Sequence, residues 1–213
     1  MKRPIIRLAA APIAAILLAS ALTGSATAGQ TDLQKARAAT AQFHDLGLAG
    51  QAGFGQPSAP APLHFCISSL DNTGAMGFHY INGANLNNIV DPAKPAVLVY
   101  APDTHGRLHL AALEYVIFQS AWFANHAADT TPEMFGQMMM KSDGTRFEIP
   151  PFFALHVWLF QSNPAGEFAP FNPNVSCDSA SASAGRSTAA GKAVVAITAS
   201  ARRWSCEVAT RIA

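Results

Sequence analysis

Short stretches in the middle of the chain carry apolar side chains that either alternate with polar ones or run together. Stretches of this kind, rich in β-branched and aromatic residues and bounded by turn-forming residues, predict β-strands. The segment 71–74 (DNTG) separates the first two stretches, and 103–106 (DTHG) is typical of a tight hairpin connection. The strands predicted in this way are 63–70, 75–82, 96–101, 108–118 and 152–161.

In residues 31–52 the spacing of small and apolar residues differs from that of the predicted strands. Small and apolar residues recur there every three to four positions, as they do along one face of a helix. Asp32 is a suitable N-cap for such a helix, and Gly53 and Gly55 are expected to end it. The narrow face that we expect to be buried carries Ala36, Thr40, Phe43, Gly47 and Gly50.

One helix followed by a run of antiparallel strands indicates an α+β fold. Both faces of the predicted strands are rather apolar, so the sheet should be covered on both sides or closed on itself. We therefore expect an N-terminal helix packed on a curved antiparallel sheet or a small open barrel. Residues 119–140 are expected to form a lid-like insertion with a short helix, and residues 29–177 to form a single domain.

The two ends of the chain differ from the middle. Residues 1–28 begin with Lys2 and Arg3, continue through an apolar stretch and end on A-x-A, which predicts a signal peptide cleaved before Gly29. Residues 178–213 are small and polar and bury little, which predicts a disordered tail. We expect the mature protein to be secreted or periplasmic, with no membrane insertion after cleavage.

Charge and cysteine content narrow the function classes further. The chain has 213 residues, a net charge of +1 and dispersed basic residues, so no nucleic-acid partner is expected. In an exported protein disulfides form and persist. Of the three cysteines, Cys206 lies in the biased tail, and we predict a disulfide between Cys66 and Cys177. The chain has no C-x-x-C motif, which favours a structural disulfide over a redox pair.

A histidine or a glutamate occupies an apolar stripe in three of the predicted strands. Strict alternation places His79 with Gly77 and Ile81, and His156 with Ala154, Trp158 and Phe160. It places Glu114 with Leu108, Leu110, Ala112, Val116 and Phe118. A buried carboxylate without a partner is costly, so we expect Glu114 to have a polar partner, and a histidine on an adjacent strand is a suitable one.

Three interpretations of this set remain open. Two histidines and a carboxylate from different strands are a familiar ligand set for a divalent metal such as Zn, Fe or Mn. The same residues without metal would suit acid–base catalysis, and a buried structural network that includes Tyr80 or Trp158 is the third interpretation. The sequence contains neither HExxH nor HxH, no G-x-S-x-G and no phosphate-binding glycine loop. The methionines 138–140 point in different directions on a helix, which favours packing over copper binding.

Several words of the sequence resemble a group of bacterial secreted proteins to which no activity is attached. These words are ATAQFHDLGLAGQAGF, GAMGFHYIN, LEYVIF and LHVWLFQSNPAGEFAPFNPNVSC, and they span about residues 36–177. The resemblance implies that His44, His79, Glu114, His156, Asn163 and Pro164 belong to the pattern of the group. His44 flanks the apolar face of the predicted helix, next to Phe43, so it is either a packed histidine of the helix or a residue that faces the same pocket.

From these patterns we expect an exported domain that binds a small ligand or a metal ion in a pocket lined by His44, His79, Glu114 and His156. The metal ligands would be the last three of these residues. One alternative is a metal-dependent or acid–base enzyme that uses the same pocket, and another is a structural or protein-binding module of the cell envelope.

Overall fold

The computed structural model describes residues 19–178, and all structural statements below concern these residues. Most of the predicted signal peptide (1–18) and nearly all of the predicted disordered tail (179–213) lie outside the described residues. Among the described residues, no helix combines the length and the apolar character that a membrane span requires.

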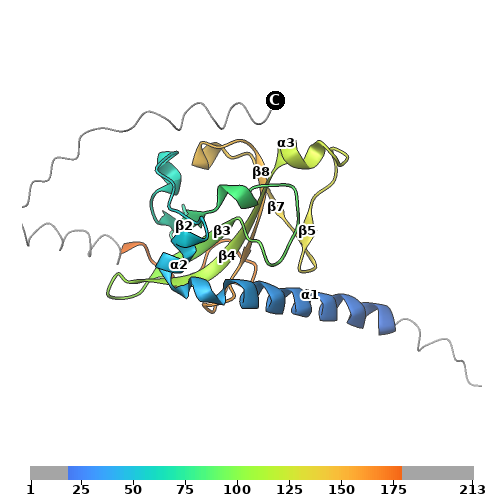
Figure 1. Ribbon diagram of the computed structural model, residues 1–213, viewed down its shortest axis with the longest axis horizontal. Helices are drawn as coiled ribbons and strands as arrows, with labels where there is room; N and C mark the ends of the chain where they lie inside the picture. Colours follow the sequence, from blue (N-terminus) through green and yellow to red (C-terminus); the bar gives the residue numbers. More distant parts are fainter. Residues whose placement is uncertain (1–18, 179–213) are drawn as a thin grey trace, which may run out of the picture.

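The predicted α+β fold is confirmed: an N-terminal helix packs on a six-stranded antiparallel sheet that curls strongly into a half-barrel. In Figure 1, α1 runs along one side of the sheet, and α3 lies beyond its far end. From edge to edge the sheet consists of β1 (Ile67–Ser68), β2 (Ala75–Ile81), β3 (Val97–Pro102), β4 (Leu108–Phe118), β8 (Phe152–Val157) and β7 (Met140–Ser142). The strands β5 (Glu133–Met134) and β6 (Gln137–Met138) form a separate two-stranded sheet.

The helical segment is divided where the sequence predicted one helix. It consists of α1 (Ala19–Thr40), the 3₁₀ turn η2 (Ala41–His44) and α2 (Leu46–Gln51). The division occurs at Asp45, whose side chain accepts hydrogen bonds from the backbone N–H groups of Gly47 and Leu48 and so caps a new helix. The prediction that Asp32 caps the helix was wrong, since Asp32 lies inside α1.

The helices cover one face of the sheet through an apolar core. Leu33, Ala36, Phe43 and Ala49 are buried against alternate residues of the central strands, which include Leu98, Tyr100, Leu113, Tyr115 and Leu155. The hydroxyl group of Tyr100 donates a hydrogen bond of 2.5 Å to the carbonyl of Phe43. This bond holds the turn between α1 and α2 against β3.

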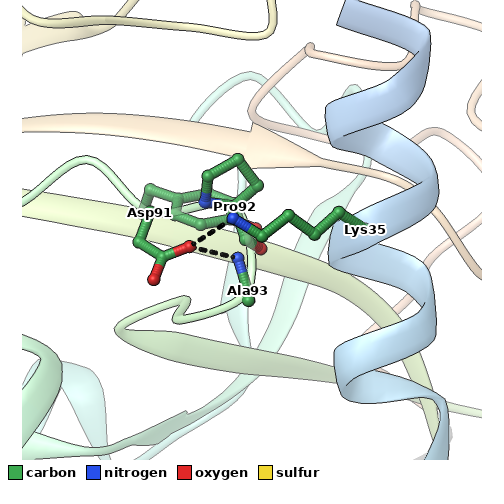
Figure 2. A network of polar contacts seen from close by, with 5 residues as sticks. Lys35, Asp91, Pro92 and Ala93 are labelled. Atoms are coloured by element: carbon green, nitrogen blue, oxygen red, sulfur yellow. Dashed lines mark hydrogen bonds and ion pairs between the residues drawn. The ribbon is translucent and has the colours of Figure 1, made fainter.

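A polar contact ties α1 to the loop that leads into β3. Figure 2 shows Lys35 reaching the carboxylate of Asp91, which also accepts a hydrogen bond from the backbone of Ala93. The same loop is also bound to the sheet, because the hydroxyl of Tyr115 in β4 donates a hydrogen bond of 2.7 Å to the carbonyl of Pro92. An exposed ion pair such as Lys35–Asp91 contributes about 1 kcal/mol at most, so it orients the helix rather than holding it.

A β-bulge changes which residues of β4 share a face with Glu114. Val99 of β3 pairs with Ala112 of β4, but the next residue, Tyr100, pairs with Leu110, so Ala111 is the extra residue. Leu108 and Leu110 therefore lie on the helix-covered side, and the sequence-based placement of these two leucines beside Glu114 was wrong. Ala112, Val116 and Phe118 do share the face of Glu114, as predicted.

The ends of several strands differ from the prediction. The first strand is reduced to β1, because the predicted segment begins in the 3₁₀ turn η3 (Ala61–Leu63) next to prolines, which lack an N–H for pairing. The last strand ends at Val157, after which the N–H of Trp158 bonds to the carbonyl of Glu167. The predicted insertion 119–140 contains the expected short helix, α3 (Gln119–Phe123), but its end leads into β7, a sixth strand that the sequence pattern did not indicate.

The predicted disulfide between Cys66 and Cys177 is present. It joins residues separated by 111 positions, with their Cα atoms 5.6 Å apart. Cys66 directly precedes β1, so the bond fixes this edge strand to the end of the described domain.

Candidate functional site

Three strands of the sheet bring together three of the residues that the sequence indicated. His79 lies on β2, Glu114 on β4 and His156 on β8, and all three point away from the helices. The antiparallel register places Glu114 directly opposite His156. His79 reaches Glu114 across β3, where the register pairs Val97 with Glu114 and Val99 with His79.

The carboxylate of Glu114 lies between the two imidazoles. Its Oε2 atom is 3.4 Å from Nε2 of His79, and its Oε1 atom is 3.8 Å from Nδ1 of His156. The two imidazole rings are nearly perpendicular, with their centroids 6.0 Å apart. One possible ligand atom from each residue falls in a group whose members lie within 4.8 Å of one another.

All three side chains are buried, and burial disfavours their charged forms. It raises the pKa of Glu114 to about 8. It lowers the pKa of His79 to about 4, against a smaller and opposite effect of the Gly77 backbone. Burial, followed by the neighbouring His79, lowers the pKa of His156 to about 3. At neutral pH without an ion, the group is therefore a protonated carboxyl between two neutral imidazoles.

The polar atoms of this group are poorly satisfied by the protein itself. Nδ1 of His79 and Nε2 of His156 are buried and have no hydrogen-bond partner of good geometry. The two His–Glu separations also exceed the 2.7–3.2 Å or so that is usual for an N–H···O hydrogen bond. Leaving a buried polar group unpaired costs about 1–3 kcal/mol, so the arrangement is expensive for a purely structural network.

The three residues form the floor of a cavity of about 380 Å³ on the side of the sheet opposite the helices. Most of the other lining residues are apolar. They come from the sheet itself, as Val97 and Ala154 do, and from the turns that surround it, as Leu63 and Phe147 do. The sheet is thus covered on both faces, by helices on one side and by these turns over the cavity on the other.

The cavity is partly covered because the two edges of the half-barrel are joined above it. The turn η3 precedes the edge strand β1, the turn η5 (Thr145–Phe147) connects β7 with β8, and the two turns pack together. Arg146 of η5 donates a hydrogen bond to the carbonyl of Ser68 in β1. Its guanidinium also lies over the rings of Phe147 and Phe171, at 5.5 and 5.7 Å from their centroids.

The other residues singled out from the sequence lie elsewhere. His44 is exposed in η2 and contacts the ring of Phe160 edge-on, at 4.9 Å between centroids, so it is not brought into the cavity. Asn163 belongs to a turn, where its side chain binds the backbone of Ala165 and Phe171. Pro164 is exposed in the same turn.

Sequence reasoning missed the cavity wall that comes from β7 and the turns. Met140, Ser142 and Phe147 line the cavity, although their segment carries no strong strand pattern. Phe147 and Arg146 stand in a short polar stretch before two prolines, which reads as a connecting loop. Their position over the cavity depends on packing against a strand far away in the sequence, so it cannot be predicted from the local sequence pattern.

The comparisons with known proteins add no assignment to this geometry. No protein-family model, curated protein or solved structure matches the chain.

Proposed function

We propose that the protein binds a divalent transition-metal ion through His79, Glu114 and His156 at the floor of its cavity. The observation that carries this proposal is the convergence of three buried ligand atoms, from three strands, within 4.8 Å of one another. Two imidazoles and a carboxylate are the donors that Zn²⁺, Fe²⁺ or Mn²⁺ accept, and a three-residue set leaves further coordination positions open.

The distances are near those that an ion requires. Ligand atoms at about 2.0–2.2 Å from a tetrahedral ion lie about 3.3–3.6 Å from each other. The distance of 3.4 Å between Nε2 of His79 and Oε2 of Glu114 lies in this range, and the distance of 3.8 Å between Nδ1 of His156 and the other carboxylate oxygen, Oε1, is slightly longer. The widest separation, at most 4.8 Å, would shorten by about 1 Å on binding, which rotation of the side chains can supply.

The protonation states also support an ion. Metal ligation needs neutral imidazoles, and burial already lowers the pKa of both histidines far below neutral pH. Glu114 would exchange its proton for the ion, so the affinity for metal should increase as the pH rises toward about 8. An ion would thereby provide a positive charge next to this buried carboxylate.

We further propose that the domain is exported and binds its ligand outside the cytoplasm. Support comes from the signal-like residues 1–28 and from the Cys66–Cys177 disulfide, a type of bond that is rare in the cytoplasm. The cavity above the three residues supports a small molecule as the ligand.

Zinc titration of the metal-free, untagged protein tests the metal proposal. We expect one Zn²⁺ per chain in the wild type. Glu114→Gln keeps the shape of the neutral acid and removes the ligating charge. Loss of an outer-shell partner of a metal ligand already costs about 10–100-fold, so loss of Glu114 itself should weaken binding by at least about 100-fold.

Glu133→Gln is the matched control, because it makes the same chemical change at an exposed position of β5. It should leave zinc affinity unchanged. A wild-type protein that takes up no zinc, or a Glu114→Gln variant that binds zinc as tightly as the wild type, would contradict the proposal and favour the buried structural network.

A further inference from the structure

We propose that the ligand of the cavity is a small monocarboxylic acid with an apolar tail, whose carboxylate meets the metal-bearing floor and whose tail fills the space above it. This inference rests on the proposed metal site. It adds the chemical class of the molecule that occupies the open coordination positions.

The net charge of the metal-loaded site favours a ligand with an anionic head group. A divalent ion held by one carboxylate and two neutral imidazoles leaves a single net positive charge at a buried position. Among the described residues that line the cavity, no other side chain carries a formal charge. A buried charge without a counter-charge is costly, and one carboxylate from the ligand would neutralise it while supplying an oxygen ligand to the metal.

The walls of the cavity favour a ligand with an apolar tail. They consist of buried apolar side chains, such as Ile67, Met76 and Phe152, and of half-buried ones, such as Leu86 and Ile149. Pockets that recognise small molecules have this composition, with a few polar groups that fix the orientation of the ligand. Among the described residues that line the cavity, His79, Glu114 and His156 form the one cluster of polar side chains, so the polar end of the ligand should point toward them.

The volume limits the length of the tail. A water molecule takes up about 30 Å³ of liquid, so the cavity of about 380 Å³ corresponds to about a dozen waters. A straight-chain acid of about ten carbons has a similar number of non-hydrogen atoms. Decanoate is therefore a suitable probe, with hexanoate and acetate as shorter members of the series.

The experiment measures the binding of these three acids to the zinc-loaded wild-type protein by calorimetry. Each buried methylene contributes about 0.8 kcal/mol, so affinity should rise by up to about fourfold per methylene from acetate to decanoate. Decan-1-ol has the same tail without the carboxylate and should bind at least about tenfold more weakly than decanoate. Without zinc, decanoate and decan-1-ol should bind with similar affinity.

A cavity variant gives a second, independent readout. Val116 lines the cavity two residues after Glu114 on the same face of β4 and is half-buried, so Val116→Phe should fill part of the space. We expect it to keep zinc and to bind decanoate at least about tenfold more weakly, with acetate unaffected. Ile89→Phe enlarges an exposed side chain outside this cavity and should leave both ligands unaffected.

The outcomes separate this inference from the metal proposal. Equal affinities for acetate and decanoate would overturn the apolar tail, and equal affinities for decanoate and decan-1-ol would overturn the carboxylate head. In both cases the zinc site would stand. Failure of the wild type to bind zinc would instead overturn the metal proposal, and the present inference with it. Because the chain-length series uses only the wild type, it decides the question even if Val116→Phe does not fold.

Discussion

At the scale of the residue, the protein buries an acid at the floor of its cavity, where Glu114 is 7% exposed. Glu114 stays protonated at neutral pH because burial raises its pKa to about 8, and the neighbouring histidines stay neutral because burial lowers theirs to about 4 and 3. Groups whose environments shift their pKa values so strongly, in a cavity, are typical of functional sites. The same shifts make the stability of the metal-free protein depend on pH.

The direction of that dependence follows from the number of protons bound in each state. Between pH 4.5 and 8 the folded protein holds a proton on Glu114 that the unfolded chain has lost, so this group makes stability fall as pH rises. From pH 3–4 to 6.5 the unfolded chain holds protons on His79 and His156 that the folded protein lacks, so these two make stability rise. Above pH 6.5 only the contribution of Glu114 remains.

We therefore expect the free energy of unfolding of the metal-free protein to fall by about 1–2 kcal/mol between pH 6.5 and 8, because one proton changes stability by about 1.4 kcal/mol per pH unit. Glu114→Gln should remove this decrease, and the difference between the two proteins in urea denaturation isolates it from other groups. Parallel pH profiles for the wild type and the variant would contradict the protonated state of Glu114.

At the scale of the element, the site depends on how closely the strands approach each other. Gly77, two residues before His79 in β2, has φ +110°, and a Cβ atom there would lie 2.5 Å from the carbonyl oxygen of Tyr100 in β3. Both the backbone conformation and the close approach therefore require glycine. This residue fixes the path of β2 that carries His79 toward Glu114.

We expect Gly77→Ala to reduce the free energy of unfolding by about 2–6 kcal/mol, because strain at a positive φ and a clash with a neighbouring strand each cost about 1–3 kcal/mol. Gly83→Ala in η4 (Gly83–Asn85) is the control, since nothing lies within 4 Å of a Cβ atom at that position. Thermal or urea denaturation measures both. A Gly77→Ala protein as stable as Gly83→Ala would show that β2 can shift without cost.

Much of the element level was predictable from the sequence, and the failures have local physical causes. The bounds of β4 were predicted correctly, and those of β2 nearly so, because their apolar patterns are long. The helix was predicted as continuous because nothing in its periodicity reveals that Asp45 caps a second helix. The leucines of β4 were assigned to the wrong face because the extra residue of a bulge cannot be read from alternation alone.

At the scale of the whole molecule, the fold is a curled sheet whose two faces differ in what they pack against. One face carries α1 and the apolar core, and the other carries the cavity with its three polar residues. The edges of the sheet are joined by Arg146 and by the packing of η3 against η5, while the disulfide fixes β1 to the end of the domain. The sequence indicated the three site residues and the disulfide, but the closure over the site arises only from contacts between distant segments.

Anomalous diffraction at the zinc edge, from crystals of the zinc-loaded protein, tests most directly whether His79, Glu114 and His156 jointly hold one divalent ion. We expect a single strong peak about 2.0–2.2 Å from one nitrogen of each imidazole and from an oxygen of the carboxylate. A zinc-loaded crystal with no peak between these three side chains, or with its peak on surface residues only, would contradict the claim.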